Sequence, residues 1–205
     1  MRRIDYFFSA VSTWAYVGHA LFVDIARRHG CDIGYRPVSL SKLFPESGGL
    51  PLKQRHPLRQ RYRCLELQRW REKRGIPLNL TPKAFPFDAT LPDRAVIAAV
   101  QAGKDPEAFV RGILRSVWAE ERDPSDPVVL AELAEAAGLD STSVIEAAGG
   151  ETAGAEYARN LEEALAIGVF GSPTYIVDGE LFWGQDRLEL LDEMLASGRA
   201  PYRPL

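Results

Sequence analysis

Ser12 occupies a position where a side-chain hydroxyl can do chemistry. It follows a short apolar run at residues 3–8 and precedes residues 14–28, whose apolar positions recur at helical spacing. A serine there is a favoured helix cap, which is a role without chemistry. Alternatively, the helix N-terminus stabilises an anion and the Ser12 hydroxyl donates to it. A thiol would ionise more readily at such a position, and its sulfur would arrive with a bound cofactor, because no cysteine is adjacent.

A second candidate is the dipeptide Ser172-Pro173, which lies in the run Gly-Ser-Pro-Thr directly before a strand-like segment. The pattern is compatible with a cis peptide bond, although only about 5% of X–Pro bonds in folded proteins are cis. A kink here would leave the backbone N–H and C=O of Ser172 unpaired within a sheet. A peptide-like ligand could then pair with them as an added strand. The alternative interpretation is an ordinary turn into a strand.

A third candidate lies between the last predicted strand and the last predicted helix, in Trp183-Gly184-Gln185-Asp186. A negative charge in the first turn of a helix is favourable, so Asp186 has a purely capping interpretation. In the functional interpretation, Gln185, Asp186 and the helix N-terminus hold the charged amino and carboxylate ends of a small peptide.

Many arginines and lysines lie between residues 53 and 74, and most are expected on a solvated helix face. The net charge of −3 and the pI near 5.7 argue against a general nucleic-acid binder. Three basic residues near the preceding loop, Lys42, Lys53 and Arg55, could anchor a carboxylate substrate, since an arginine binds a carboxylate bidentately.

The elements that position these residues come from both ends of the chain. The predicted elements there are a strand at 3–8, a helix at 14–28, a strand at 32–40, a hairpin at 174–183 turning at Gly179-Glu180, and a helix at 185–196. The first three form a β-α-β unit, which predicts parallel strands with a helix on one face.

The middle of the chain is helical in pattern. Residues 41–54 are expected to be a loop because of their prolines and glycines, and helices are predicted at 57–74, 91–102, 105–121, 127–138, 141–148 and 153–167. The predicted fold class is therefore α/β. One domain is built from residues 1–42 and 165–205, and residues 43–164 form an all-helical insertion.

Two cysteines are too few for a disulfide framework and are compatible with a reducing compartment. Cys31 is expected at the start of a strand and Cys64 at a buried position on a helix. The three histidines show no metal-ligand spacing, so no metal is expected. No apolar stretch reaches the roughly 18 residues that span a membrane. The expected location is the cytoplasm, with neither membrane nor nucleic acid as a partner.

Together these residues resemble the 2-hydroxychromene-2-carboxylate isomerases, which are similar to kappa-class glutathione transferases within the DsbA-like thioredoxin superfamily. The resemblance covers nearly the whole chain. Its specific part is Gly168–Leu188, with Gly-Ser-Pro-Thr and Phe-Trp-Gly-Gln-Asp-Arg-Leu. The supporting segments are Asp5-Tyr-Phe-Phe with Ser12 and Tyr16, Leu67-Gln-Arg-Trp70 with Gly75-Ile-Pro77, and Trp118 with Glu120.

The resemblance implies a thioredoxin-like fold with a helical insertion, a homodimer and bound glutathione. It places Ser12 beside the glutathione sulfur, and it pairs the backbone of Ser172, before cis Pro173, with the cysteinyl part. The γ-glutamyl end would be bound by Trp183, Gly184, Gln185 and Asp186. The nearest matches to the basic residues that contact substrate in the family are Lys42, Lys53 and Arg55.

Two positions depart from the family pattern. Where the family has Ser-Pro, this chain has Ser12-Thr13, and where it has Asn after Phe-Pro-x, this chain has Asp88. Asp88 thus falls among the substrate-binding positions, and a negative charge there would disfavour a carboxylate if it faced inward. Dithiol members of the fold carry Cys-x-x-Cys where this chain reads Ser12-Thr13-Trp14-Ala15, so no disulfide can cycle there.

The implied reaction is the isomerisation of a hydroxychromene carboxylate, an aromatic carboxylate of aromatic degradation. The glutathione thiolate adds to the conjugated carbon, the ring opens, the bond rotates and the thiolate leaves. Two alternatives stay open. One is glutathione conjugation or peroxide reduction of the kappa-class kind, and the other is a thiol-peptide-binding module without turnover.

Overall fold

The computed structural model describes residues 2–204 and contains one mixed four-stranded sheet with the order β2-β1-β3-β4. The strands are β1 (Arg3–Phe8), β2 (Asp32–Pro37), β3 (Thr174–Val177) and β4 (Glu180–Trp183). β1 pairs with β2 in parallel and with β3 antiparallel, and β3 pairs antiparallel with β4. The predicted β-α-β unit and the C-terminal hairpin therefore join in one sheet, with β1 and β3 in its centre.

Alternation along the central strands gives the sheet two apolar faces. On one face Tyr6 stacks on Phe8 and on Tyr175, with ring centroids 4.4 and 5.4 Å apart. Phe7 points to the other face, where it packs with Val38. Side chains of successive strand residues point to opposite faces, so a strand that is buried on both sides reads as a continuous apolar run.

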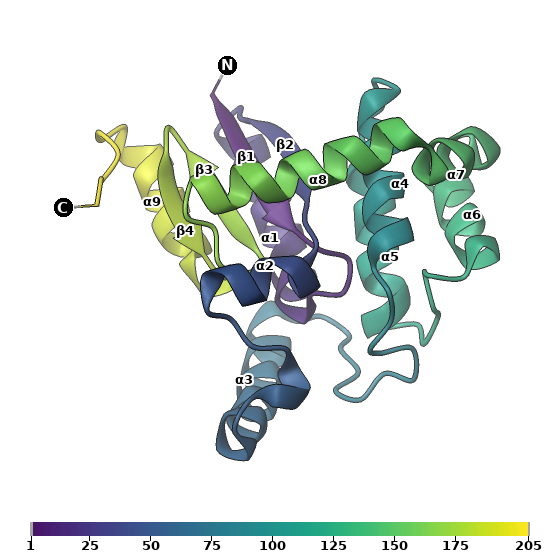
Figure 1. The fold of residues 1–205 in the computed structure, drawn as a ribbon. Coiled ribbons are helices and arrows are strands. Elements are labelled where there is room, and N and C mark those ends of the chain that lie inside the picture. The colour runs from purple at the N-terminus through teal and green to yellow at the C-terminus, as the bar shows by residue number, and fades with distance from the viewer. Residues whose placement is uncertain (1, 205) are drawn as a thin grey trace.

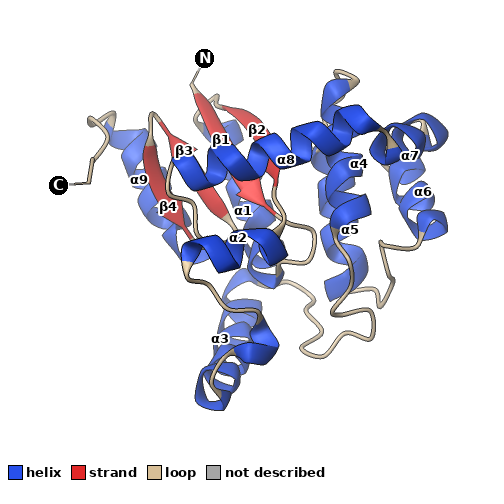
Figure 2. Cartoon of the chain, in the orientation of Figure 1, coloured by secondary structure: helices blue, strands red, loops and turns tan. Residues whose placement is uncertain are grey.

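Helices cover both faces and give three layers (Figure 1). α1 (Thr13–Arg28) and α9 (Leu188–Ser197) supply Phe22 and Leu191 to the core on the Tyr6 side. α2 (Leu40–Ser47) and the C-terminal half of α8 (Glu151–Ala166) cover the Phe7 side. Figure 2 shows the strands enclosed between these helices.

The remaining helices lie beside or below the sheet. They are α3 (Pro57–Arg74), α4 (Thr90–Gln101), α5 (Glu107–Trp118), α6 (Pro127–Ala136) and α7 (Ser141–Gly149). In Figure 1, α4 to α7 form a group on one side of the sheet, and α3 projects from the bottom of the molecule. The predicted helices of the middle segment are thus confirmed, with ends that differ by a few residues.

The prediction of a loop over residues 41–54 is wrong. Residues 40–47 form α2 with Pro45 inside it, and Leu52–Gln54 form a short 3-10 helix. Leu43 is fully buried against Val38 and Ala164, so tertiary packing stabilises a helix that its proline and flanking glycines do not predict.

The C-terminal hairpin turns one residue earlier than predicted. Asp178 and Gly179 both have positive φ, +50° and +80°, and Glu180 already belongs to β4. Two such residues are typical of the turn that matches strand twist. The last helix also begins later than predicted, since Gln185–Arg187 form a 3-10 turn before α9 starts at Leu188.

Fewer residues of α3 are buried than its apolar pattern predicts. Cys64 is exposed rather than buried, and Leu67 alone on this helix is classed as buried. Leu58, Tyr62 and Leu65 are each more than half exposed. α3 meets the rest of the described chain along one narrow face, because it projects from the molecule instead of lying on the sheet.

The predicted division into a two-part domain and an insertion stays a prediction. Its boundary at residue 164 falls inside α8, whose C-terminal half packs on the sheet. The end residues 1 and 205 lie outside the described range. Within residues 2–204, no helix is both long and apolar enough to cross a bilayer.

Candidate functional site

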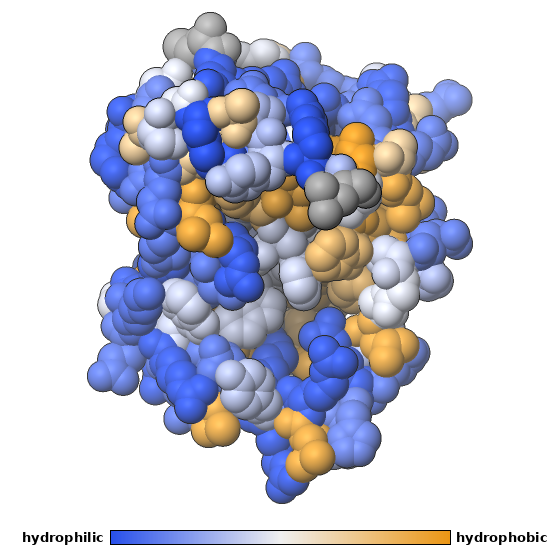
Figure 3. Space-filling view, turned by 90° about the vertical axis from the view of Figure 1, so that its left-hand side faces the viewer, coloured by the Kyte–Doolittle hydropathy of each residue, from blue (hydrophilic) through white to orange (hydrophobic). Residues whose placement is uncertain are grey.

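A cleft of about 600 Å³ lies where α3, the end of α2, the 170–172 turn and the residues after β4 meet. Aromatic walls come from Trp14, Trp70 and Trp183, and charged residues of both signs surround them. Figure 3 shows one side of the molecule, hollowed near its centre and bordered by hydrophilic and hydrophobic residues. The carboxylate and the ammonium groups of a zwitterionic peptide could both pair with oppositely charged side chains in such a cleft.

Ser12 lies beneath the cleft as the N-cap of α1. Its Oγ accepts a hydrogen bond from the Ala15 N–H at 3.2 Å and donates one to the backbone carbonyl of Ser172 at 3.2 Å. The residue is 7% exposed. The capping role is therefore confirmed, and the hydroxyl proton points toward the turn that lines the cleft.

The Ser172–Pro173 peptide bond is cis, as the sequence pattern suggested. The Ser172 carbonyl is not left without a partner, because it accepts from Ser12, and the Ser172 hydroxyl accepts from the Ser9 N–H at 3.3 Å. The loop before α1 and the turn before β3 are thereby joined side by side. Ser172 lines the cleft, whereas Pro173 is buried behind it.

Trp183 and Gly184 shape the wall of the cleft next to this turn. The Trp183 indole lies against Phe170, with ring centroids 4.6 Å apart, and a Cβ on Gly171 would come within 2.4 Å of its Nε1. Gly184 has φ +99° and donates its N–H to the Pro173 carbonyl at 2.9 Å. Only glycine combines this backbone angle with so close an approach of the Asp186 carboxylate.

Gln185 is buried under Arg74, the last residue of α3, which the sequence did not single out. The Arg74 guanidinium donates to the Gln185 side-chain oxygen at 3.1 Å and to its backbone carbonyl at 3.2 Å, and it pairs with Glu189 at 3.0 Å. Asp186 is exposed at the cleft and pairs with Arg187 at 2.6 Å. Arg74 thus fixes the segment that presents Asp186.

The predicted substrate-binding residues are divided. Arg55 lines the cleft, where its Nε donates to the Leu50 carbonyl at 2.8 Å, and burial together with nearby Arg59 lowers its pKa. Lys42 and Lys53 are exposed and do not line the cleft. Asp88 is exposed, does not line the cleft, and accepts from the N–H and the hydroxyl of Thr90, the first residue of α4. Of these four residues, the structure brings only Arg55 to the cleft.

Arg63 is a further basic residue that the sequence gave no reason to separate from its neighbours. It donates to the Thr13 hydroxyl at 2.5 Å, at the first residue of α1, and burial lowers its pKa. A proline, which the resemblance predicts at position 13, would offer no such acceptor. The geometry therefore adds a guanidinium to the helix N-terminus that carries Ser12, and an anion bound there would face both.

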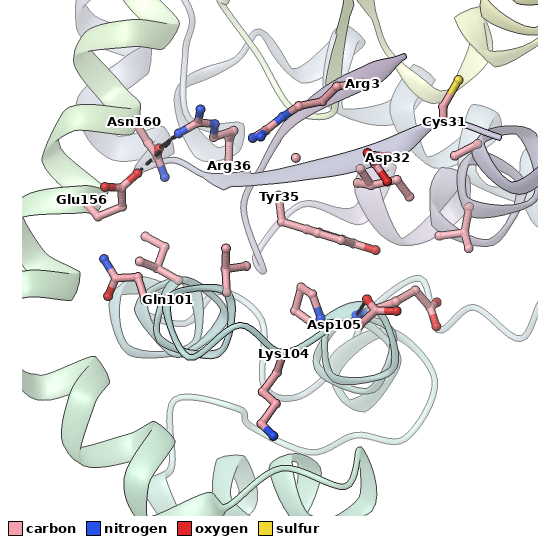
Figure 4. Close-up of a pocket in the computed structure, with 18 of the residues that line it drawn as sticks. Arg3, Cys31, Asp32, Tyr35, Arg36, Gln101, Lys104, Asp105, Glu156 and Asn160 are labelled. Atoms are coloured by element: carbon pink, nitrogen blue, oxygen red, sulfur yellow. Dashed lines mark hydrogen bonds and ion pairs between the residues drawn. The ribbon is translucent and has the colours of Figure 1, made fainter. Parts of the chain in front are cut away.

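A second cavity of about 800 Å³ lies along the free edge of β2, away from every predicted site residue (Figure 4). Tyr35 points into it, and Arg36 donates from its wall to Glu156 at 3.3 Å and to Asn160 at 3.4 Å. Its acids and bases neutralise one another, so its size alone does not indicate a ligand. Residues 2–204 also contain no group of three or more potential metal ligands.

Comparison with known proteins shows which proteins this chain is similar to. The family model of the DSBA-like thioredoxin domain matches residues 3–196. A 2-hydroxychromene-2-carboxylate isomerase of Sphingobium xenophagum is 32% identical over 95% of this chain and 98% of that protein. Another, from Pseudomonas putida, is 26% identical over 94% and 93%. The solved structure of a 2-hydroxychromene-2-carboxylate isomerase has a TM-score of 0.79 at 24% identity, covering 95% of each chain. The predicted thioredoxin-like fold is confirmed.

The Arg74 contacts give a prediction about stability. We expect Arg74→Met to lower the free energy of unfolding by about 1–3 kcal/mol, because it leaves the buried Gln185 without its donors. Lys73→Met is the matched control, since Lys73 pairs with the same Glu189 but is exposed, and its cost should stay within about 0.5 kcal/mol. Urea unfolding of both variants measures this, and equal costs would contradict the role of Arg74.

Proposed function

This chain belongs to the DSBA-like thioredoxin domain family and, within it, to the 2-hydroxychromene-2-carboxylate isomerases, and from that premise we propose that it is a glutathione-dependent isomerase of that type. The observation that carries the proposal is the Ser12 hydroxyl at the N-terminus of α1, bonded to the Ser172 carbonyl at the cleft. Ser12 is the proposed catalytic residue.

The cleft residues fit glutathione by their chemistry. His56 and Arg187 are candidates for the carboxylate groups of glutathione, and Asp186 is a candidate for the amino group of the γ-glutamyl end. The 170–172 turn and Trp183 form an adjoining wall for the cysteinyl part. The volume of about 600 Å³ falls in the usual range for a small-molecule site.

Binding of a peptide at Ser172 would change the partner of the Ser12 hydroxyl. In the ligand-free arrangement Ser12 donates to the Ser172 carbonyl. A peptide N–H that pairs with this carbonyl can take over the acceptor, as an added strand does. The Ser12 hydroxyl then turns to a sulfur at the helix N-terminus and stabilises its negative charge. Binding and activation of the thiol are coupled through a single hydrogen bond.

The chain's own residues then act by charge and position. When bound, glutathione supplies the nucleophilic sulfur that adds reversibly to the conjugated carbon of the substrate. The carbon–carbon double bond becomes a single bond, which can rotate. Ser12, the α1 N-terminus and Arg63 hold negative charge at the sulfur position, and they are oriented before reaction. Arg55 and Arg59 are the proposed partners of the substrate carboxylate. Lys42, Lys53 and Asp88 have no assigned role in this arrangement.

Two further properties are part of the proposal. A homodimer is supported by the exposed apolar stripe of α3, formed by Leu58, Tyr62 and Leu65, because contiguous exposed apolar residues often mark protein interfaces. Sedimentation velocity measures it directly. A cytoplasmic location is supported by the two cysteines, which are both free.

The first test is titration calorimetry of the protein with reduced glutathione, followed by an absorbance assay on 2-hydroxychromene-2-carboxylate. We expect binding and glutathione-dependent turnover without loss of glutathione. Stoichiometric consumption of glutathione would instead indicate a transferase or peroxidase. Binding without turnover on any electrophile would indicate a thiol-peptide-binding module, and no binding would leave Ser12 a helix cap only.

Substitution Ser12→Ala tests the hydroxyl. We expect the pKa of the bound thiol to rise and turnover to fall by about tenfold or more, because the sulfur loses a donor, while the lost cap costs only about 1 kcal/mol of stability. Ultraviolet titration of the thiolate measures the pKa. Ser143→Ala, which removes a hydroxyl at the N-terminus of α7, is the control. An unchanged titration and rate would remove Ser12 from the mechanism.

Substitution Asp186→Ala tests the γ-glutamyl end. We expect the dissociation constant of glutathione to rise about tenfold, equivalent to about 1.4 kcal/mol. Cysteinylglycine, which lacks the γ-glutamyl group, should bind the variant and the unaltered protein equally. If both ligands weaken together, Asp186 acts on the cleft as a whole and not on that end of the peptide.

A further inference from the structure

Asp93 is a fully buried acid that no step of the proposed reaction uses. It lies in the first turn of α4, and three donors converge on its carboxylate. The Ala10 N–H donates at 2.7 Å to one oxygen, and the hydroxyls of Ser9 and Tyr157 donate at 2.8 Å to the other. A buried charge without an opposite charge is costly, so a carboxylate retained in this position needs these bonds.

These bonds join Asp93 to both halves of the candidate site. Ser9, which donates its hydroxyl to Asp93, donates its N–H to the Ser172 hydroxyl at 3.3 Å. The Ser9 carbonyl accepts the Ser12 N–H at 2.9 Å. Asp93 therefore lies two hydrogen bonds from Ser12 and two from Ser172, on the side of the loop opposite the cleft.

We propose that Asp93 is a positioning residue, which holds the loop from Ser9 to Ser12 against Ser172 and so directs the Ser12 hydroxyl toward the cleft. The proposal rests on the proposed function for its catalytic consequence, although the contacts that support it are independent of glutathione. It also assigns a role to the helical segment of the chain. α4 and α8, through Asp93 and Tyr157, brace the loop that precedes α1.

The protonation state of Asp93 decides how well it can do this. Its pKa is raised to about 7, because the effect of burial, with a smaller one from nearby Asp88, outweighs the three hydrogen bonds that lower it. From α8 it is faced by Tyr157, whose own pKa is raised by burial and by Asp93. Arg94, the next residue on α4, donates to the Gly150 carbonyl instead. The pKa of this carboxyl therefore lies near neutral pH.

Protonation has opposite effects on stability and on the loop. The raised pKa means that the folded protein favours the protonated carboxyl, so this contribution to stability is present in acid and is lost as the pH rises through about 7. The ionised form, in contrast, accepts from all three donors. The protonated form must donate from one oxygen, so a hydroxyl has to turn away and the loop loosens. Stability should therefore fall as the pH rises toward about 7, and activity should rise as the pH passes through about 7.

The test compares Asp93→Asn with Asp126→Asn, a helix-capping aspartate of α6 that does not contact the loop. We expect Asp93→Asn to lower kcat about ten- to a hundredfold with an unchanged dissociation constant for glutathione, and to flatten the pH dependence of both kcat and unfolding free energy near pH 7. Tyr157→Phe, which keeps the carboxylate but removes a bond that lowers its pKa, should move both steps to higher pH.

Hydrogen exchange of the segment covering residues 9–12, measured without glutathione, separates this proposal from the proposed function. Faster exchange of this segment in Asp93→Asn, with a protein that does not bind glutathione, would keep the bracing role and reject the isomerase. Unchanged exchange, or a pH step near 7 that persists in Asp93→Asn, would overturn the role of Asp93. A variant that fails to fold leaves the shifts in Tyr157→Phe to decide.

Discussion

The hydrogen bond from the Ser12 hydroxyl to the Ser172 carbonyl joins residues 160 positions apart, and the candidate site depends on it. It can form because β1 and β3 pair antiparallel in the sheet, so the loop after β1 and the turn before β3 lie at the same end of the sheet. The whole middle of the chain is inserted between these two segments. The site therefore requires the register of β1 against β3, which the apolar side chains on both faces fix. A slip of one residue would turn every side chain to the opposite face.

Two features that favour an anion meet where this contact joins α1. The helix N-terminus already favours an anion, and Arg63 adds a guanidinium that is held by the Thr13 hydroxyl. Burial lowers the pKa of Arg63, which is the sign of a cation short of solvent and of compensating charge. A bound anion would relieve this cost. Thr13, which departs from the family pattern, is thereby accommodated as the acceptor that positions Arg63 instead of as a defect of the active turn.

The sequence was informative where a local pattern coincides with a tertiary role. The sequence singles out Ser12, Ser172, Gly184 and Asp186 because adjacent residues form the pattern of a helix cap, a proline turn or a helix start. Arg63, Arg74 and Asp93 were missed, since an arginine among many, or an acid in the first turn of a helix, has the same local pattern whether it is solvated or buried. The helix at 40–47 was missed for a related reason, because its stability comes from Leu43 packing on residues far away in sequence.

Because this chain has no cysteine at the start of α1, a nucleophile at that position has to come from a bound ligand. A protein with its own cysteine at the start of α1 has a nucleophile whether or not a ligand is bound. In the function proposed for this chain, Ser12 stabilises a sulfur that glutathione brings, and in the structure its hydroxyl donates to the Ser172 carbonyl. The loop geometry set by Asp93 then matters more than in a dithiol protein, since a hydroxyl donor acts over one hydrogen-bond length and in one direction. When a cysteine nucleophile is replaced by a hydroxyl that only donates a hydrogen bond, the rate depends less on that side chain itself. It depends more on the residues that orient it.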